Sequence, residues 1–319
     1  MKSIVLDGFA VNPGDMSWDF LAEFGPYTVY DQTEDDQVAE RIGDADIVMT
    51  NRKKITPAVL AACPNLKFVS ALGTGYDMID VPACRARGVE VCNIPGYSTI
   101  SVSQHAFTLL LSLSTDINGY RKAVRDGRWT GQPDFRYQTI PFTELDGKTV
   151  GVYGCGAIGS RFASLCSAFG MQVLAYRRTA PLGKQGDMEF VTADRLLAES
   201  DFVSLHCPLT EETRGLVNRE FLAKMKKGSY LINTSRGAVV DEEALCEALT
   251  AGHLAGAGLD VMVKEPPLPD NPLLALQNCI ITPHCAWTSL ETRHRLVDIL
   301  ASNIRSFITS GEGIHRVLP

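Results

Sequence analysis

The chain has 319 residues, about twice the roughly 150 residues of an average domain, so we expect two domains. Hydrophobic residues make up 45% and charged residues 21%, which is typical of a globular enzyme. No apolar run reaches the ~18 residues that a membrane span needs, so we expect no transmembrane helix. The 30 basic and 37 acidic residues give a net charge of −7 without a basic block, which argues against nucleic acid as a partner.

The nine cysteines occur singly, without a C-x-x-C pair, so neither a zinc site nor a disulfide framework is expected, and we predict no metal. The N-terminus acquires a charge too soon for a signal peptide. Together these features predict a protein of the reducing cytoplasm.

The first part of the chain alternates short β-rich runs with helical stretches. Strands are predicted at 4–6, 27–30, 46–49, 67–72 and 89–92, and helices at 35–42 and 56–62. This alternation is typical of a parallel sheet with crossover helices. It indicates a first α/β domain that carries no glycine fingerprint.

A mostly apolar segment at 99–124 is predicted to be one long helix leading from one domain to the other, and a loop rich in Gly, Trp and Pro follows at 127–145. A second α/β domain begins near Lys148. Its later strands are predicted at 202–205, 229–232, 255–259 and 279–282, and an amphipathic helix at 289–308 is expected to return to the first domain.

The predicted fold is therefore of the α/β class, with two doubly wound parallel-sheet domains separated by a cleft. A Rossmann cofactor domain at 99–288 is inserted in a flavodoxin-like substrate domain made of 1–98 and 289–319.

A glycine-rich turn is the most informative segment of the second domain. Gly154, Gly156 and Gly159 form a G-x-G-x-x-G motif between a predicted strand at 149–153 and a predicted helix at 160–169, and the next strand is predicted at 171–176. Such glycines make a sharp turn, let the backbone approach a pyrophosphate and let the helix pack on the strand. The unit predicts a dinucleotide site, the alternative being a turn that merely packs a helix on a sheet.

Two arginines stand at the end of the second strand of this unit. An NAD site usually carries an acid there for the ribose 2′-hydroxyl, but this chain has Arg177 and Arg178. Guanidinium groups offer charge-assisted donors to a 2′-phosphate. We therefore predict that NADP(H) is preferred, with NAD(H) also possible.

Polar residues follow three later strands of the same predicted sheet: Arg236, Asp260 with Glu265 five residues on, and His284. Ligands of open α/β sheets bind outside the carboxyl ends of the strands, so these residues are predicted to face the glycine turn. Arg236 can grip a substrate carboxylate, and His284 can protonate a carbonyl oxygen as hydride arrives at carbon. Glu265 would favour the charged imidazole and fix its tautomer. Each residue alone has a structural alternative as a cap, a loop acid or a loop histidine.

Seven segments carry a family resemblance: GTGYDMID at 73–80, NIPGYST at 93–99, the glycine turn, HCPLT at 206–210, NTSRG at 233–237 with Val240-Asp241, Asp260-Val261 through Glu265-Pro266, and Pro283-His284. With these motifs, nearly the whole chain resembles the D-isomer-specific 2-hydroxyacid dehydrogenases. The resemblance implies an NAD(P)-dependent oxidoreductase in which Arg236 binds the substrate carboxylate and His284, paired with Glu265, donates the proton.

The resemblance also implies further contacts. The backbone at Thr74 and Gly75 would touch the substrate carboxylate, and Asp260 the nicotinamide carboxamide. Ala157 and Ile158 would face the pyrophosphate, and the remaining implied cofactor contacts are Cys207, Pro208, Thr213, Thr234, Ser235 and Trp287. A homodimer joined through the cofactor domain and its long helix is the implied assembly.

Shorter strings narrow the substrate. Residues 6–15, the Thr50–Lys53 segment and Trp287 resemble the glycerate dehydrogenase or hydroxypyruvate reductase branch. We thus expect reduction of a small 2-keto acid, hydroxypyruvate or glyoxylate, to the D-2-hydroxy acid. Lys53 is a candidate substrate residue, although it is also a typical surface lysine.

Other activities stay open at this stage. D-3-phosphoglycerate and D-lactate dehydrogenase are alternatives, and the lactate-type and formate-type activities rank lower than hydroxypyruvate or glyoxylate reduction. Because the chain ends soon after the return helix, we expect no regulatory domain, which disfavours phosphoglycerate. An alternative of another class is an NAD(H)-sensing, corepressor-like binding protein.

Overall fold

A computed structural model describes residues 1–137 and 142–318. The chain divides into two compact units: Met1–Ser98 together with the residues from Thr288 onward, and Thr99–Trp287. The loop predicted at 127–145 includes residues 138–141, which lie outside the described part.

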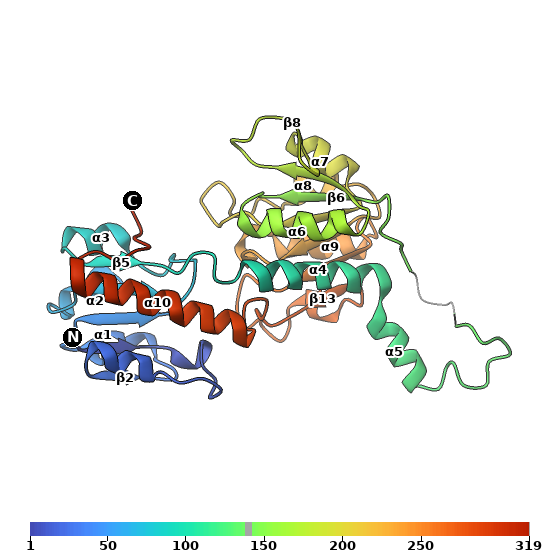
Figure 1. Cartoon of the computed structure of the whole chain (residues 1–319). Coiled ribbons are helices and arrows are strands. Elements are labelled where there is room, and N and C mark those ends of the chain that lie inside the picture. The colour runs from blue at the N-terminus through green and yellow to red at the C-terminus, as the bar shows by residue number, and fades with distance from the viewer. Residues whose placement is uncertain (138–141, 319) are drawn as a thin grey trace. The chain divides into compact units, whose positions relative to one another are not determined.

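The first unit contains a five-stranded parallel sheet with the order β2-β1-β3-β4-β5 (Figure 1). Its strands are β1 Ser3–Val5, β2 Tyr27–Val29, β3 Ile47–Thr50, β4 Phe68–Ala71 and β5 Glu90–Cys92. Its α-helices are α1 Val38–Ile42, α2 Pro57–Ala62, α3 Val81–Ala86 and α10 Leu290–Ser310, and 3-10 helices occur at Gly8–Ala10, Asp19–Phe24 and Asp35–Gln37. All five strands predicted in this part of the chain are found.

Helix α10 contributes an apolar face to the core of this unit. Leu296, Leu300 and Ile304 follow one another at four-residue spacing and are fully buried. The ring of Phe307 lies 4.8 Å from the ring of Phe68 on β4. Burying side chains of this size stabilises the unit by about 1.5–3 kcal/mol each.

The second unit contains an eight-stranded sheet with the order β13-β12-β11-β10-β6-β7-β9-β8. The strands are β6 Thr149–Tyr153, β7 Gln172–Tyr176, β8 Gly183–Gln185, β9 Met188–Phe190, β10 Phe202–Leu205, β11 Tyr230–Asn233, β12 Gly256–Leu259 and β13 Cys279–Ile281. The helices are α4 Thr99–Thr115, α5 Ile117–Arg125, α6 Ala157–Ala168, α7 Ala193–Glu199, α8 Arg219–Lys224 and α9 Glu242–Thr250, with 3-10 helices at Gly237–Val239 and Pro272–Ala275. Because β6, β7 and β10 to β13 are parallel, the loops after these strands share one edge of the sheet.

The prediction of one helix over 99–124 is wrong. The helix breaks at Asp116, whose φ of 44° is left-handed, and the Asp116 side chain accepts a 3.0 Å hydrogen bond from the backbone N–H of Gly119. Asp is one of the few residues that tolerates this conformation, and here it caps the N-terminus of α5. The segment is therefore two helices, α4 and α5, both within the second unit (Figure 1).

Two smaller differences from the prediction concern helix α6 and the edge of the sheet in the second unit. The helix after the glycine turn begins at Ala157, three residues before its predicted start, so Gly159 lies in its first turn. Strands β8 and β9 were not predicted, and they pair antiparallel at the sheet edge. Within the described residues, no helix has the length and apolarity that crossing a membrane requires.

Candidate active site

The glycine turn joins β6 to α6 with little room for side chains at two of its three glycines. Gly154 has a φ of 100°, and a Cβ there would lie 2.6 Å from the backbone N of Cys207. A Cβ on Gly159 would lie 2.3 Å from the carbonyl oxygen of Gly154. A Cβ on Gly156 would meet nothing within 4 Å. The first and third glycines are thus needed for the fold of the turn, whereas the second leaves space open at the N-terminus of α6, where an anion is favoured.

The loops after the neighbouring strands flank this turn. Tyr176, the last residue of β7, accepts a 2.9 Å backbone hydrogen bond from Gly154, and Arg177 and Arg178 follow with exposed side chains. After β10, Cys207 is buried and Pro208 is exposed. The described groups around the turn thus combine open space, an α6 N-terminus and two cations, a set that fits a phosphate-rich dinucleotide.

His284 and Glu265 are in direct contact. The Nδ1 atom of His284 lies 2.6 Å from Oε2 of Glu265, and Glu265 Oε1 accepts a 3.1 Å hydrogen bond from the backbone N–H of Met262. The two side chains are only 26% and 23% exposed, so water screens the pair weakly. Because Nδ1 bonds the carboxylate, Nε2 is the ring nitrogen that can give a proton to another group.

Arg236 stands at the same edge of the sheet, three residues after β11. Its Nη1 donates a 2.9 Å hydrogen bond to the Ser235 carbonyl, and its own carbonyl accepts one from the side chain of fully buried Asn233. A Cβ on the next residue, Gly237, would overlap the Met262 backbone at 2.0 Å, so the Arg236 loop packs directly on the loop that leads to Glu265.

Thr234, in the same loop, has a buried hydroxyl oxygen that forms no hydrogen bond with any residue the structure describes. Buried polar groups are normally satisfied, so an orphaned hydroxyl beside Ser235 and Arg236 indicates a position where a ligand atom can bond. Thr234 and Ser235 are two of the predicted cofactor residues.

Asp260 anchors the loop that carries His284. Its carboxylate is 1% exposed and accepts hydrogen bonds from the Thr282 hydroxyl at 2.6 Å and from the backbone N–H groups of Cys285 and Ala286 at 2.9 Å. Burial alone raises the pKa of Asp260, but the hydrogen bonds from these groups and from His105 outweigh it and hold the pKa below its usual value. The carboxylate therefore stays charged, and its predicted contact with a nicotinamide carboxamide stays a prediction.

His105 on α4 was not predicted as part of this site. Its Nε2 lies 2.9 Å from the Thr282 hydroxyl and 3.4 Å from Oδ1 of Asp260. In the sequence it is the one ionisable residue of a mostly apolar helix, and no spacing rule links it to a strand end 155 or more residues later. A second histidine, His206, can be set aside as an acid, because burial lowers its pKa to about 3 and keeps it neutral.

The predicted substrate residues of the first unit follow its own strands. After β4, the Thr74 hydroxyl donates to the Ile94 carbonyl at 2.9 Å, and Gly75 is half-buried. After β3, Lys53 forms a 3.0 Å ion pair with Asp35, whose side chain is 86% exposed. Such a pair is weak, so Lys53 can exchange Asp35 for another anion.

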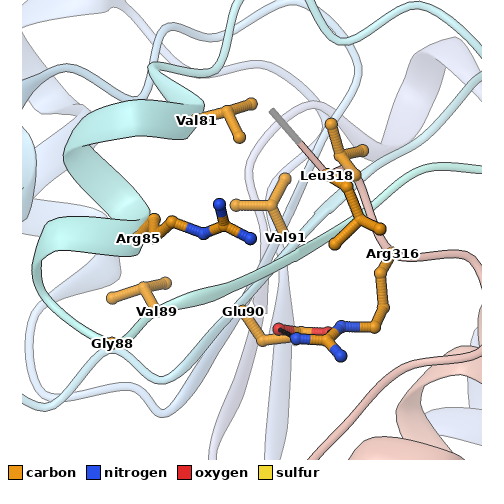
Figure 2. Close-up of a pocket in the computed structure, with 9 residues that line it drawn as sticks. Val81, Arg85, Gly88, Val89, Glu90, Val91, Arg316 and Leu318 are labelled. Carbon is orange, nitrogen blue, oxygen red and sulfur yellow. Dashed lines mark hydrogen bonds and ion pairs between the residues drawn. The ribbon is translucent and has the colours of Figure 1, made fainter.

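A separate cavity of about 180 Å³ in the first unit contains none of the predicted site residues (Figure 2). It lies between α3, β5 and the chain at 316–318. Arg85 points into it, while Arg316 is neutralised by a 2.6 Å ion pair with Glu90. It is thus distinct from the strand-end constellation.

Comparison with known proteins identifies the class. Residues 107–286 match the family model described as "D-isomer specific 2-hydroxyacid dehydrogenase, NAD binding domain". The chain therefore belongs to the D-isomer-specific 2-hydroxyacid dehydrogenase family, whose members are NAD(P)-dependent oxidoreductases acting on CH–OH groups.

Within the family, the chain is similar to members of the glycerate dehydrogenase and hydroxypyruvate reductase branch. It is 44% identical to a hydroxypyruvate reductase of Blautia hydrogenotrophica over 97% of both chains. It is 37% identical to a glycerate dehydrogenase of Methylorubrum extorquens over 96% of both. Among solved structures, an NADPH-dependent glyoxylate/hydroxypyruvate reductase of Sinorhizobium meliloti, in complex with NADP and malonate, superposes with a TM-score of 0.84 at 29% identity, covering 99% of this chain and 96% of that one.

Proposed function

We propose that this protein reduces hydroxypyruvate, and less efficiently glyoxylate, to the D-2-hydroxy acid with NADPH as the preferred reductant. The observation that carries the proposal is the 2.6 Å His284–Glu265 pair at the same sheet edge as Arg236. A carboxylate grip and a proton donor are the two groups that reduction of a 2-keto acid requires. The hydroxypyruvate reductase at 44% identity supports the substrate class.

The bound nicotinamide supplies the hydride. Arg236 holds the substrate carboxylate by paired hydrogen bonds, and Thr74 and Gly75 are proposed as further substrate-binding residues. When C2 of the substrate is reduced, Nε2 of His284 would give its proton to the former carbonyl oxygen, which becomes the hydroxyl group. Glu265 keeps the ring in the tautomer that presents Nε2, and its charge stabilises the imidazolium.

The cofactor roles follow the same edge of the second unit. Ala157 and Ile158 supply the first N–H groups of α6 to the pyrophosphate, and Arg177 and Arg178 bind a 2′-phosphate. The remaining predicted contacts, Cys207, Pro208, Thr213, Thr234, Ser235, Asp260 and Trp287, hold the nucleotide and nicotinamide. We further propose a homodimer and a cytoplasmic location.

The test is a panel assay of the purified protein. Cofactor oxidation is followed by nicotinamide absorbance with hydroxypyruvate, glyoxylate, pyruvate and 3-phosphohydroxypyruvate, each with NADPH and NADH. We expect the highest kcat/KM for hydroxypyruvate with NADPH. His284→Asn should lower kcat by about 10²–10⁴-fold.

His253→Asn is the matched control, since that ring bonds the Leu222 carbonyl and stands in no predicted site. A folded wild-type protein that binds the cofactor but reduces none of the four acids would overturn the proposal and favour a dinucleotide-sensing binding protein.

A further inference from the structure

An ion pair bridges the two loops that flank the glycine turn. Nη1 of Arg178, two residues after β7, lies 2.7 Å from Oε2 of Glu212 in the loop after β10. Strand β6 lies between β7 and β10 in the sheet, so the pair joins the loops on either side of the turn that follows β6. The end of β7 and the loop after β10 also contact the turn: the Tyr176 carbonyl accepts from the Gly154 N–H, and the Cys207 backbone leaves no room for a Cβ on Gly154.

Glu212 is held in place by a hydrogen-bonded turn. The Thr213 hydroxyl donates to the Pro208 carbonyl at 2.7 Å and accepts from the backbone N–H of Thr210 at 2.8 Å. The backbone N–H of Arg214 donates to the Thr210 carbonyl at 2.9 Å. The neighbouring Glu211 forms no ion pair with any residue that the structure describes. The turn therefore presents one of its two acids, and not both, to Arg178.

From this arrangement we infer that Glu212 is a specificity-determining residue that competes with a ribose 2′-phosphate for Arg178. The inference rests on the proposed role of Arg178 in NADPH binding. A phosphate must displace the Glu212 carboxylate from the Arg178 guanidinium before it can bind there. A ribose with a free 2′-hydroxyl meets no such obstacle, so Glu212 reduces the advantage of NADPH over NADH that the two arginines create.

The size of the effect follows from exposure. The Arg178 and Glu212 side chains are 75% and 72% exposed, and exposed ion pairs contribute little because water and salt screen them. The competition is therefore a matter of a few-fold in affinity. Arg177, which forms no ion pair with a described residue, remains available to the phosphate throughout.

The experiment measures binding without turnover. Isothermal titration gives the Kd of 2′,5′-ADP and of 5′-AMP, which differ only in the 2′-phosphate, for the wild type, Glu212→Gln and Glu211→Gln. We expect E212Q to bind 2′,5′-ADP about two- to fivefold more tightly at low salt, with 5′-AMP unchanged. E211Q removes the same charge from the same turn without touching Arg178, and its affinities should match those of the wild type.

A double-mutant cycle separates competition from simple repulsion. In an Arg178→Ala background, E212Q should change the affinity for 2′,5′-ADP by less than about 1.5-fold. The inference would be overturned if E212Q bound 2′,5′-ADP no more tightly than the wild type. It would also be overturned if E211Q gained the same affinity for 2′,5′-ADP, or if E212Q gained its full affinity in the Arg178→Ala background.

The inference and the proposed cofactor preference fail separately. If the wild type uses NADPH and NADH equally but E212Q binds 2′,5′-ADP more tightly, the proposed preference is wrong and the competition between Glu212 and the phosphate is supported. A wild type that prefers NADPH, with E212Q unchanged, removes only the competition.

Discussion

Removing the charge of Glu265 while keeping its shape tests how the protein prepares His284 to donate a proton. In Glu265→Gln, one end of the amide can still accept from the Met262 N–H, but the other end has no charge to offer Nδ1 of His284. A hydrogen bond to a charged group contributes about 1.5–3 kcal/mol, and the pair is mostly buried. If that stabilisation acts on the imidazolium, kcat for hydroxypyruvate falls about 10- to 150-fold.

The assay is steady-state reduction of hydroxypyruvate at saturating NADPH, with the Kd of 2′,5′-ADP measured on the same samples. The binding constant should stay the same, because Glu265 acts on proton transfer and not on the adenosine end of the cofactor. Glu242→Gln is the matched control: Glu242 holds the same loop, accepting from the Val263 N–H at 2.7 Å and from the Asn271 side chain at 2.8 Å, but it does not touch the histidine.

Comparable kcat values for E265Q and the wild type would refute this reasoning. A loss of kcat in E242Q equal to that in E265Q would refute it as well, since the loop and not the carboxylate would then be responsible.

Three further predictions concern the fold of the site. Asp260→Asn should lower the free energy of unfolding by about 1–3 kcal/mol at pH 7, because one of the two carboxylate oxygens that accept from buried donors becomes an amide NH2 group. The deficit should shrink as the pH falls below about 3.9, where the unfolded wild-type chain takes up a proton that the folded carboxylate, with its lowered pKa, binds only at lower pH; urea unfolding across pH measures both effects. Gly159→Ala should lower the free energy of unfolding by about 1–3 kcal/mol, because its Cβ overlaps the Gly154 carbonyl. Gly156→Ala should keep the wild-type melting temperature but weaken dinucleotide binding, since its Cβ enters the space left open at the turn. Equal melting temperatures for the two variants would contradict this expectation. In the wild type, the free energy of unfolding should fall as the pH drops below 6.5, because the unfolded chain binds a proton at His206 that the folded ring, with its pKa of about 3, does not bind. His206 contributes at most about 1.4 kcal/mol per pH unit to this fall, and His206→Asn should remove that contribution.

Much of the fold could be predicted from sequence because its signals are local. Strands buried on both faces read as short apolar runs, and the glycine turn between β6 and α6 marks the Rossmann unit. The prediction of one helix over 99–124 gave too little weight to the polar stretch at 114–119, where Asp116 and the Asn118-Gly119 pair are typical of a helix boundary. Strands β8 and β9 have three residues each and little apolar pattern, so periodicity gave no signal for them.

The candidate site divides in the same way. Arg236, Glu265 and His284 could be predicted because each follows a strand of a parallel sheet, so topology alone brings them to one edge. The contacts of His105 with Thr282 and of Glu212 with Arg178 depend on which loop residues meet in space. No sequence spacing encodes those meetings, and only the structure reveals them.

The central claim, hydride transfer to a 2-keto acid with His284 as the proton donor, is tested most directly by following the hydride itself. The protein is incubated with hydroxypyruvate and NADPH that carries deuterium on the transferred face of the nicotinamide C4, and the glycerate formed is analysed by mass spectrometry and chiral chromatography. The account predicts D-glycerate with one deuterium at C2, formed about 10²–10⁴-fold more slowly by His284→Asn. Glycerate of the L configuration, product without deuterium, or an unchanged rate in the histidine variant would contradict it.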